Sequence, residues 1–142
     1  MPSVFEWNPK DMQEYGVYVF LRDEMMAILT KMMDGLHILE SEILSGLVLL
    51  ERAICESESA FSLETLGTGL PLAVCVAVMV AHKTGADQTY TNATFCSILG
   101  IELSLFARAE TAFLEAVKFR VVVSGEEYEE ALLFLSRLVQ HT

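Results

Sequence analysis

A run of twelve apolar residues, from Leu70 to Ala81, constrains the fold of this chain more than any other feature. The run reads LPLAVCVAVMVA and holds no charged residue, so a helix made from it has no polar face to turn toward water. Such a helix would be roughly 18 Å long, which is too short to cross a bilayer. Pro71 would stand in its first turn, where the missing amide donor is tolerated. The sequence therefore predicts a central helix, about residues 70–83, that is buried on all sides.

The remaining apolar residues recur at helical spacing, which predicts an all-α fold of about six helices. The acidic, glycine-containing segment 56–69 is expected to be a surface connection, and residues 119–123 an extended connector, because no second strand is available to pair with them. The helices predicted around the central one cover residues 15–34, 40–55, 93–99 and 102–118, and a last one that follows Ser124.

Four local features give sharper expectations. Gly46 lies within a predicted helix, where glycine is unfavourable unless another helix must come close. Ser124 and Glu127 have the spacing of a capping box at the start of the last helix. Gly35 is well placed to end the first helix. Glu110 falls among apolar residues, between Phe106 and Phe113, so its carboxylate should have a partner.

Composition narrows the class of protein. The 142 residues are expected to form one domain (14–142) with an N-terminal arm (1–13), and 53% of them are hydrophobic. The formal net charge of −11 opposes binding to nucleic acid or to an anionic membrane and suits a basic protein partner. Three cysteines without paired spacing are typical of a reducing compartment. With no signal-peptide pattern at the N-terminus, we expect an intracellular protein of the cytoplasm or nucleus.

Catalytic and metal-binding patterns are not found in the sequence. The three histidines His37, His82 and His141 stand far apart, and no zinc, calcium, phosphate-loop or nucleophile-elbow motif occurs. Cys75 and His82 could share one face of a helix, but such residues in and beside an apolar run are more typical of a core than of a metal site. The residues therefore favour a binding module that uses no cofactor, no metal and no small-molecule substrate.

One segment carries a family resemblance. Residues 81–123, AHKTGADQTYTNATFCSILGIELSLFARAETAFLEAVKFRVVV, resemble the second half of a cyclin box, and most closely that of the single-box, phosphate-regulation (P-type) cyclins of fungi and protists. The chain departs from the family where Leu105, Phe106 and Ala107 replace the usual Glu-Leu-Asn, and where Ala109 replaces a leucine. The positions that match are Ala81, Lys83, Asp87, Tyr90, Thr91, Asn92, Gly100, Ile101, Glu110, Phe113, Leu114, Phe119, Val121 and Val123.

The resemblance implies a five-helix box around the apolar third helix, followed by a C-terminal helix. It implies that Lys83 and Glu110 form a charged pair that binds a cyclin-dependent protein kinase, with Phe106 and Phe113 among the apolar residues around it. The chain would then be a regulatory subunit in cell-cycle or nutrient control, and not an enzyme. Two alternatives stay open: Lys83 and Glu110 form only an internal salt bridge, or the chain is a cyclin-fold helical adaptor, or transcription-related scaffold, that no longer binds a kinase.

Overall fold

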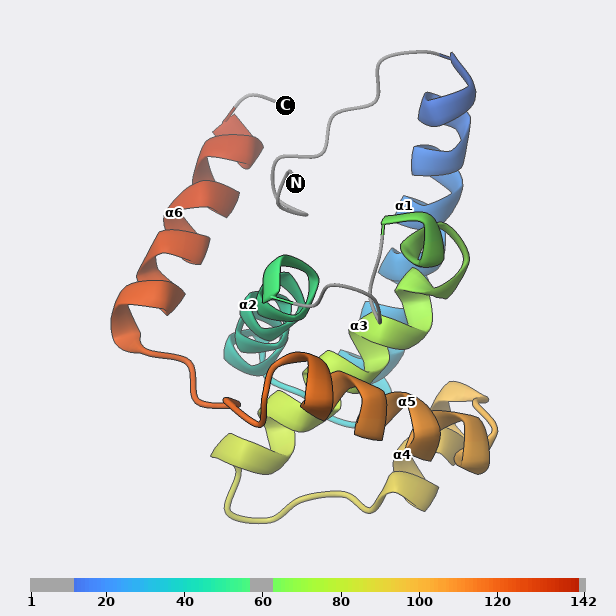
Figure 1. Ribbon diagram of the computed structural model, residues 1–142, viewed down its shortest axis with the longest axis vertical. Coiled ribbons are helices and arrows are strands. Elements are labelled where there is room, and N and C mark those ends of the chain that lie inside the picture. The colour runs from blue at the N-terminus through green and yellow to red at the C-terminus, as the bar shows by residue number, and fades with distance from the viewer. Residues whose placement is uncertain (1–11, 57–62, 141–142) are drawn as a thin grey trace.

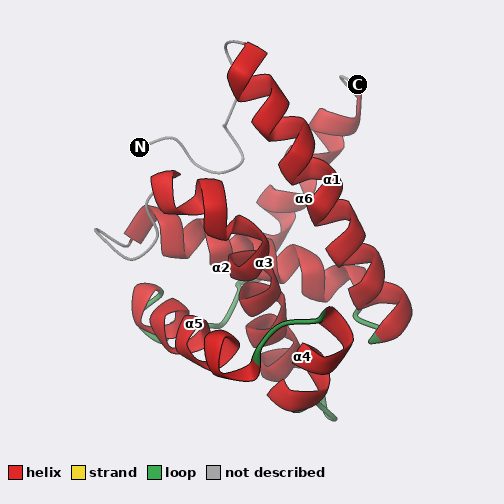
Figure 2. Ribbon diagram, turned by 90° about the vertical axis from the view of Figure 1, so that its right-hand side faces the viewer, coloured by secondary structure: helices red, strands yellow, loops and turns green. Residues whose placement is uncertain are grey.

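A computed structural model describes residues 12–56 and 63–140, and this part of the chain forms six helices and no strand (Figures 1 and 2). The all-α prediction is confirmed. The predicted arm lies almost wholly outside the described residues. The helices are α1 (Met12–Gly35), α2 (Glu40–Glu56), α3 (Leu63–Gly85), α4 (Asn92–Leu99), α5 (Leu103–Ala116) and α6 (Gly125–Gln140).

The apolar run forms the centre of the molecule, as predicted. Residues 73–81 of α3 are all buried, none with more than 7% of its surface exposed. Helices α1, α2 and α5 pack against α3, which passes through the middle of the structure in Figure 1. Among the helices of the described residues, none has the length and apolar character that crossing a membrane requires. The run is therefore the core of a helical domain.

The start of α3 differs from the prediction. The helix begins at Leu63, so residues 63–69 are helical and not a surface connection, while residues 57–62 lie outside the described part. Pro71 consequently stands inside the helix and not in its first turn. Glycine and small polar residues favour a loop locally. Extending an existing helix is nevertheless easier than starting one, because each added residue gains a hydrogen bond without the cost of nucleation. The buried run supplies that existing helix.

Close contact between α2 and α3 explains Gly46. A Cβ atom added at this glycine would lie 2.8 Å from the Cα atom of Val78. The two backbones can therefore meet only because residue 46 has no side chain. The expectation that a second helix comes close at Gly46 is confirmed.

Helix ends follow the sequence signals in most places. Gly35 ends α1, and Gly100 caps α4 in the left-handed conformation, with φ of 73°. Helix α5 ends earlier than predicted, at Ala116, because Lys118 and Phe119 also adopt positive φ angles, 57° and 59°, which no right-handed helix accepts. The predicted connector, residues 119–123, is therefore not extended at Phe119, while residues 120–124 run on without helix or strand.

The last helix is attached at its N-terminal end. The capping box is confirmed, because the Ser124 amide donates to Glu127 Oε1 and the Glu127 amide donates to Ser124 Oγ, both at 3.1 Å. Helix α6 packs mainly against α2, where Ala131 is buried. Leu132, the next residue, is 48% exposed, so the contact with α2 covers only part of the apolar residues of α6.

Arg52 of α2 holds the connector and α6 together. Its guanidinium donates to the carbonyls of Arg120 and Val122 and to Glu127 Oε2, the last at 2.6 Å. The bond from Arg52, helped by the Ser124 amide, lowers the pKa of the Glu127 carboxyl below its ordinary value. One arginine thus joins three points of the chain that lie between 68 and 75 residues away from it.

Candidate partner-binding site

Three polar side chains meet at the end of the central helix, and we call them the polar triangle: Lys83, Asn92 and Glu110. Lys83 Nζ donates to Glu110 Oε2 at 2.8 Å and to Asn92 Oδ1 at 2.6 Å. Asn92 Nδ2 donates to Glu110 Oε1 at 3.2 Å, which closes the triangle. The carboxylate that the sequence placed among apolar residues therefore has two partners, as expected.

Each corner of the polar triangle comes from a different helix. Lys83 lies in the last turn of α3, where the helix dipole favours a cation. Asn92 is the first residue of α4, and Thr91 before it caps that helix by accepting from the Thr94 amide. Glu110 lies in the middle of α5. The cluster therefore depends on the packing of three helices and cannot form from any one of them.

The polar triangle keeps capacity for a further partner. The side chain of Lys83 is 34% exposed and that of Glu110 is 17% exposed. An ammonium group carries three N–H donors, and Lys83 uses two of them inside the cluster. Each carboxylate oxygen of Glu110 accepts one bond in the cluster and has a second lone pair. Lys83 and Glu110 do form an internal salt bridge, and within the described part of the chain one donor of Lys83 and two acceptor positions of Glu110 stay unused.

Phe106 and Phe113 lie below this surface and not on it. Both side chains are completely buried, and the ring of Phe106 packs against that of Phe95 with centroids 5.6 Å apart. In this structure they offer no surface that a partner could touch. They hold α5 against the core and thereby fix the position of Glu110 relative to α3 and α4.

The surface beside Glu110 is formed by other residues of α5. The spacing of one helix face joins Glu110 to three apolar residues of α5. Leu103 comes seven residues before Glu110, Ala107 three before it, and Leu114 four after it. Leu103 is 47% exposed, Ala107 is exposed and Leu114 is half-buried. The resemblance did not imply these three as interface residues, although Leu114 is one of the matching positions. Their spacing around Glu110 on one helix face is the sequence signal that could have found them.

A second polar contact lies next to the polar triangle. His82 Nδ1 lies 2.6 Å from Glu42 Oε2, and the His82 ring stacks on Tyr90 with centroids 5.5 Å apart and an interplanar angle of 25°. Glu42 also accepts from the Leu39 amide through Oε1, at 2.9 Å. No sequence pattern indicates the contact between His82 and Glu42, because the two residues are 40 positions apart and belong to different helices.

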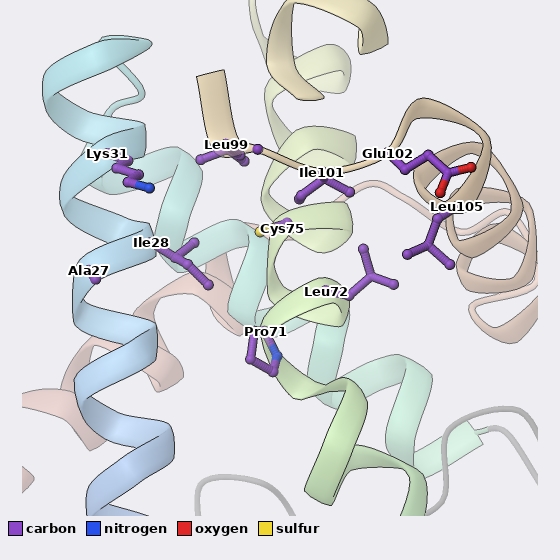
Figure 3. Close-up of a pocket in the computed structure, with 11 residues that line it drawn as sticks. Ala27, Ile28, Lys31, Pro71, Leu72, Cys75, Leu99, Ile101, Glu102 and Leu105 are labelled. Carbon is purple, nitrogen blue, oxygen red and sulfur yellow. The ribbon is translucent and has the colours of Figure 1, made fainter. Parts of the chain in front are cut away.

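A cavity of about 460 Å³ opens elsewhere on α3, between α1 and the turn that joins α4 to α5 (Figure 3). Its walls are mostly apolar, with Lys31 and Glu102 on opposite sides (Figure 3). Cys75 lies in its wall, eight residues from Lys83, which is about 12 Å along a helix. The cavity is therefore separate from the polar triangle. Its lining residues are Ala27, Ile28, Lys31, Pro71, Leu72, Cys75, Leu99, Gly100, Ile101, Glu102 and Leu105.

The buried thiol of Cys75 has low reactivity at neutral pH. Burial, with a smaller contribution from neighbouring Cys96, raises the pKa of Cys75 to about 12. A thiol reacts and binds metals as the thiolate, which is scarce at neutral pH when the pKa is that high. Over the described part of the chain, no three His, Cys, Asp or Glu side chains gather closely enough to hold a metal ion.

Comparison with known proteins identifies one family. The family model described as Cyclin matches residues 44–121, more than half of the chain, and it represents the P-type cyclins. The matched segment contains all three residues of the polar triangle. Neither curated proteins nor solved structures gave a match. The resemblance found in residues 81–123 is thereby confirmed at the level of the family.

Proposed function

The chain belongs to the cyclin family, and on that premise we propose that it is the regulatory subunit of a cyclin-dependent protein kinase. The observation that carries the proposal is the polar triangle. Within the segment that matches the family, Lys83 and Glu110 lie 2.8 Å apart, and each is partly exposed. A cyclin of this kind binds and activates a kinase and needs no catalytic group of its own.

The contacts follow from the unused hydrogen-bonding positions. The third N–H of Lys83 donates to a main-chain carbonyl of the kinase's C-helix segment, and Glu110 accepts from a main-chain amide there. Leu103, Ala107 and Leu114 on the same face of α5 cover apolar side chains of that helix, in place of the buried Phe106 and Phe113. Pressing the C-helix inward completes the Lys–Glu ion pair of the kinase, which phosphoryl transfer requires.

The acidic surface supports a protein partner with a basic contact region. The formal net charge is −11, and complementary charge steers association and speeds it. The same charge disfavours nucleic acid, whose phosphates would be repelled.

A pull-down tests the proposal. The tagged protein is incubated with lysate of its own organism, and the eluate is analysed by mass spectrometry and by a protein-kinase assay. We expect a cyclin-dependent kinase with wild type and none with Lys83→Glu. Arg108→Glu is the matched control, because Arg108 is exposed on α5, two residues from Glu110 and so on a different face, and the change in charge is the same. Equal recovery of the kinase with both variants would contradict the role of Lys83.

Leu105 favours the second candidate, a cyclin-fold adaptor without a kinase. Where P-type cyclins usually carry glutamate, Leu105 is 43% exposed and lines the cavity between α1 and α3. An adaptor would use this apolar surface for its partner. A folded, helical protein that retains no kinase, and loses its bound protein with Leu105→Glu but not with Lys83→Glu, would establish this candidate instead.

A further inference from the structure

His82 is a polar residue in the core of the described chain. Only 6% of its surface is exposed, and it directly precedes Lys83 of the polar triangle. Its ring Nδ1 has a partner in Glu42, whereas its Nε2 is buried and finds no hydrogen-bond partner among residues 12–56 and 63–140. A buried polar group without a partner costs free energy, so the position of this ring calls for a specific reason.

The orientation of the ring is set by Glu42. The carboxylate of Glu42 is held at the start of α2, because Oε1 accepts from the Leu39 amide while Oε2 meets His82 Nδ1. A flipped ring would lose the 2.6 Å bond to Glu42, and Nε2 provides no second polar link to replace it. The bond from α2 therefore decides which of the two flipped orientations the imidazole takes.

The stacked face of the His82 ring contacts the connection that leads into α4 and Asn92. Residues 86–91 form the non-helical connection between α3 and α4, and Tyr90 within it stacks on His82. Tyr90 is two residues before Asn92, which Lys83 binds. Each residue of the stacked pair is thus close in sequence to one corner of the polar triangle. His82 adjoins Lys83, and Tyr90 is two residues from Asn92.

We propose that His82 is a positioning residue for kinase binding: by stacking on Tyr90 it fixes the connection between α3 and α4 and so holds Asn92 against Lys83. This inference rests on the proposed cyclin function. Glu42 contributes by fixing the orientation of the ring through its bond to Nδ1. His82 does not touch the kinase, because its side chain is buried.

Two substitutions separate the ring from its hydrogen bond. His82→Phe keeps an aromatic face for Tyr90 and loses the bond to Glu42. His82→Asn keeps a donor close to the position of Nδ1 and loses the ring. Tyr90→Ala removes the stacked partner and leaves His82 and Glu42 intact. We expect His82→Asn and Tyr90→Ala to raise the Kd for the kinase about tenfold each, as loss of an aromatic pair allows, and His82→Phe to raise it less than about threefold.

Hydrogen–deuterium exchange gives a readout that needs no kinase. Amides of residues 86–92 should exchange faster in His82→Asn and Tyr90→Ala than in wild type and His82→Phe. Circular dichroism confirms that each variant is folded. A purely structural role would instead lower the melting temperature in all three variants and leave the Kd unchanged.

The outcomes distinguish this inference from the proposed function. If wild type binds the kinase and folded His82→Asn binds it equally well, with unchanged exchange in residues 86–92, the positioning role is overturned. If wild type binds no kinase, the proposed function fails, and unchanged exchange would overturn the structural half of the inference as well. If His82→Asn does not fold, Tyr90→Ala carries the same test.

Discussion

Helices α5 and α6 both pack against α2, yet they are held in different ways. Helix α5 also packs against α3, and it buries Phe106 and Phe113 completely on either side of Glu110. Helix α6 buries Ala131, while Leu132 and Leu133 are 48% and 57% exposed. Its attachment to α2 combines a small apolar cluster around Ala131 with the bonds of Arg52 to the connector and to Glu127 (Figure 1 shows α6 at the edge of the molecule).

This difference shows which helices of the fold have the most firmly fixed positions. A hydrogen-bonded cluster built from three helices requires those helices to be fixed to a fraction of an ångström, and close-packed side chains provide that. Polar contacts at the surface hold a helix less rigidly, because water competes for them. The polar triangle belongs to the first kind of region and α6 to the second.

The largest expected effect is in the core below α5. Phe106→Ala should lower the free energy of unfolding by about 3–5 kcal/mol, because it leaves a cavity beside Phe95. Leu133→Ala on α6 is the comparison and should change it by less than about 0.5 kcal/mol. Chemical denaturation measures both. Similar costs for the two variants would show that α5 and α6 do not differ as described.

A smaller effect is expected where α2 meets α3. Gly46→Ala should destabilise by about 1–3 kcal/mol, because the new methyl group would overlap the backbone of Val78. Gly69→Ala should have the opposite effect. No described atom lies within 4 Å of a Cβ added at Gly69, so the variant should gain about 0.5–1 kcal/mol of stability from helix propensity. Thermal melts of the two variants test this pair, and a stable Gly46→Ala would mean that the helices are further apart.

The smallest effect concerns α6 and depends on pH. Because the pKa of Glu127 is lower in the folded protein than its ordinary value, its contribution is present above about pH 4.3 and is lost as the pH falls through the folded value. The side chain of Glu127 is 41% exposed, so water screens the pair and the contribution is about 0.5 kcal/mol.

Denaturation curves at pH 6 and pH 3 measure this contribution. Wild type should lose more stability between the two pH values than Glu127→Gln does. Glu129→Gln, a change of the same kind on the exposed side of α6, should behave as wild type. An identical loss in wild type and Glu127→Gln would show that Arg52 does not stabilise the charged form.

Local signals in the sequence predicted much of the fold. The uncharged run identified the central helix, the S-x-x-E pattern identified the start of α6, and Gly46 identified a close helix contact. Each of these depends on residues within a few positions of one another. The start of α3 was predicted wrongly for the same reason, because residues 63–69 look like a loop locally and are helical in continuation of a buried helix.

Contacts between distant residues could not be predicted in this way. Nothing in the sequence indicates that Arg52 meets Glu127 or that His82 meets Glu42, since such pairs form only when helices far apart in the chain are packed. Lys83 and Glu110 were selected through the family pattern. Their side chains are hydrogen-bonded and partly exposed, which agrees with a role at an interface. The resemblance also led to Phe113, which matches the family, and to Phe106, which replaces a family leucine, but a motif does not reveal which of the apolar residues near it are buried.

The most direct test of the kinase interface is a double-mutant cycle on Lys83 and Glu110. The Kd for the kinase recovered with wild type is measured by calorimetry for wild type, Lys83→Met, Glu110→Gln and the double variant, after circular dichroism has shown that all four are folded. We predict that each single change weakens binding by about 30-fold or more, since removing one member of a desolvated charge pair costs about 2–5 kcal/mol. The double variant should lose less than the two single losses together. Wild-type affinity in both single variants would contradict the account, and the pair would then be a salt bridge of the fold alone.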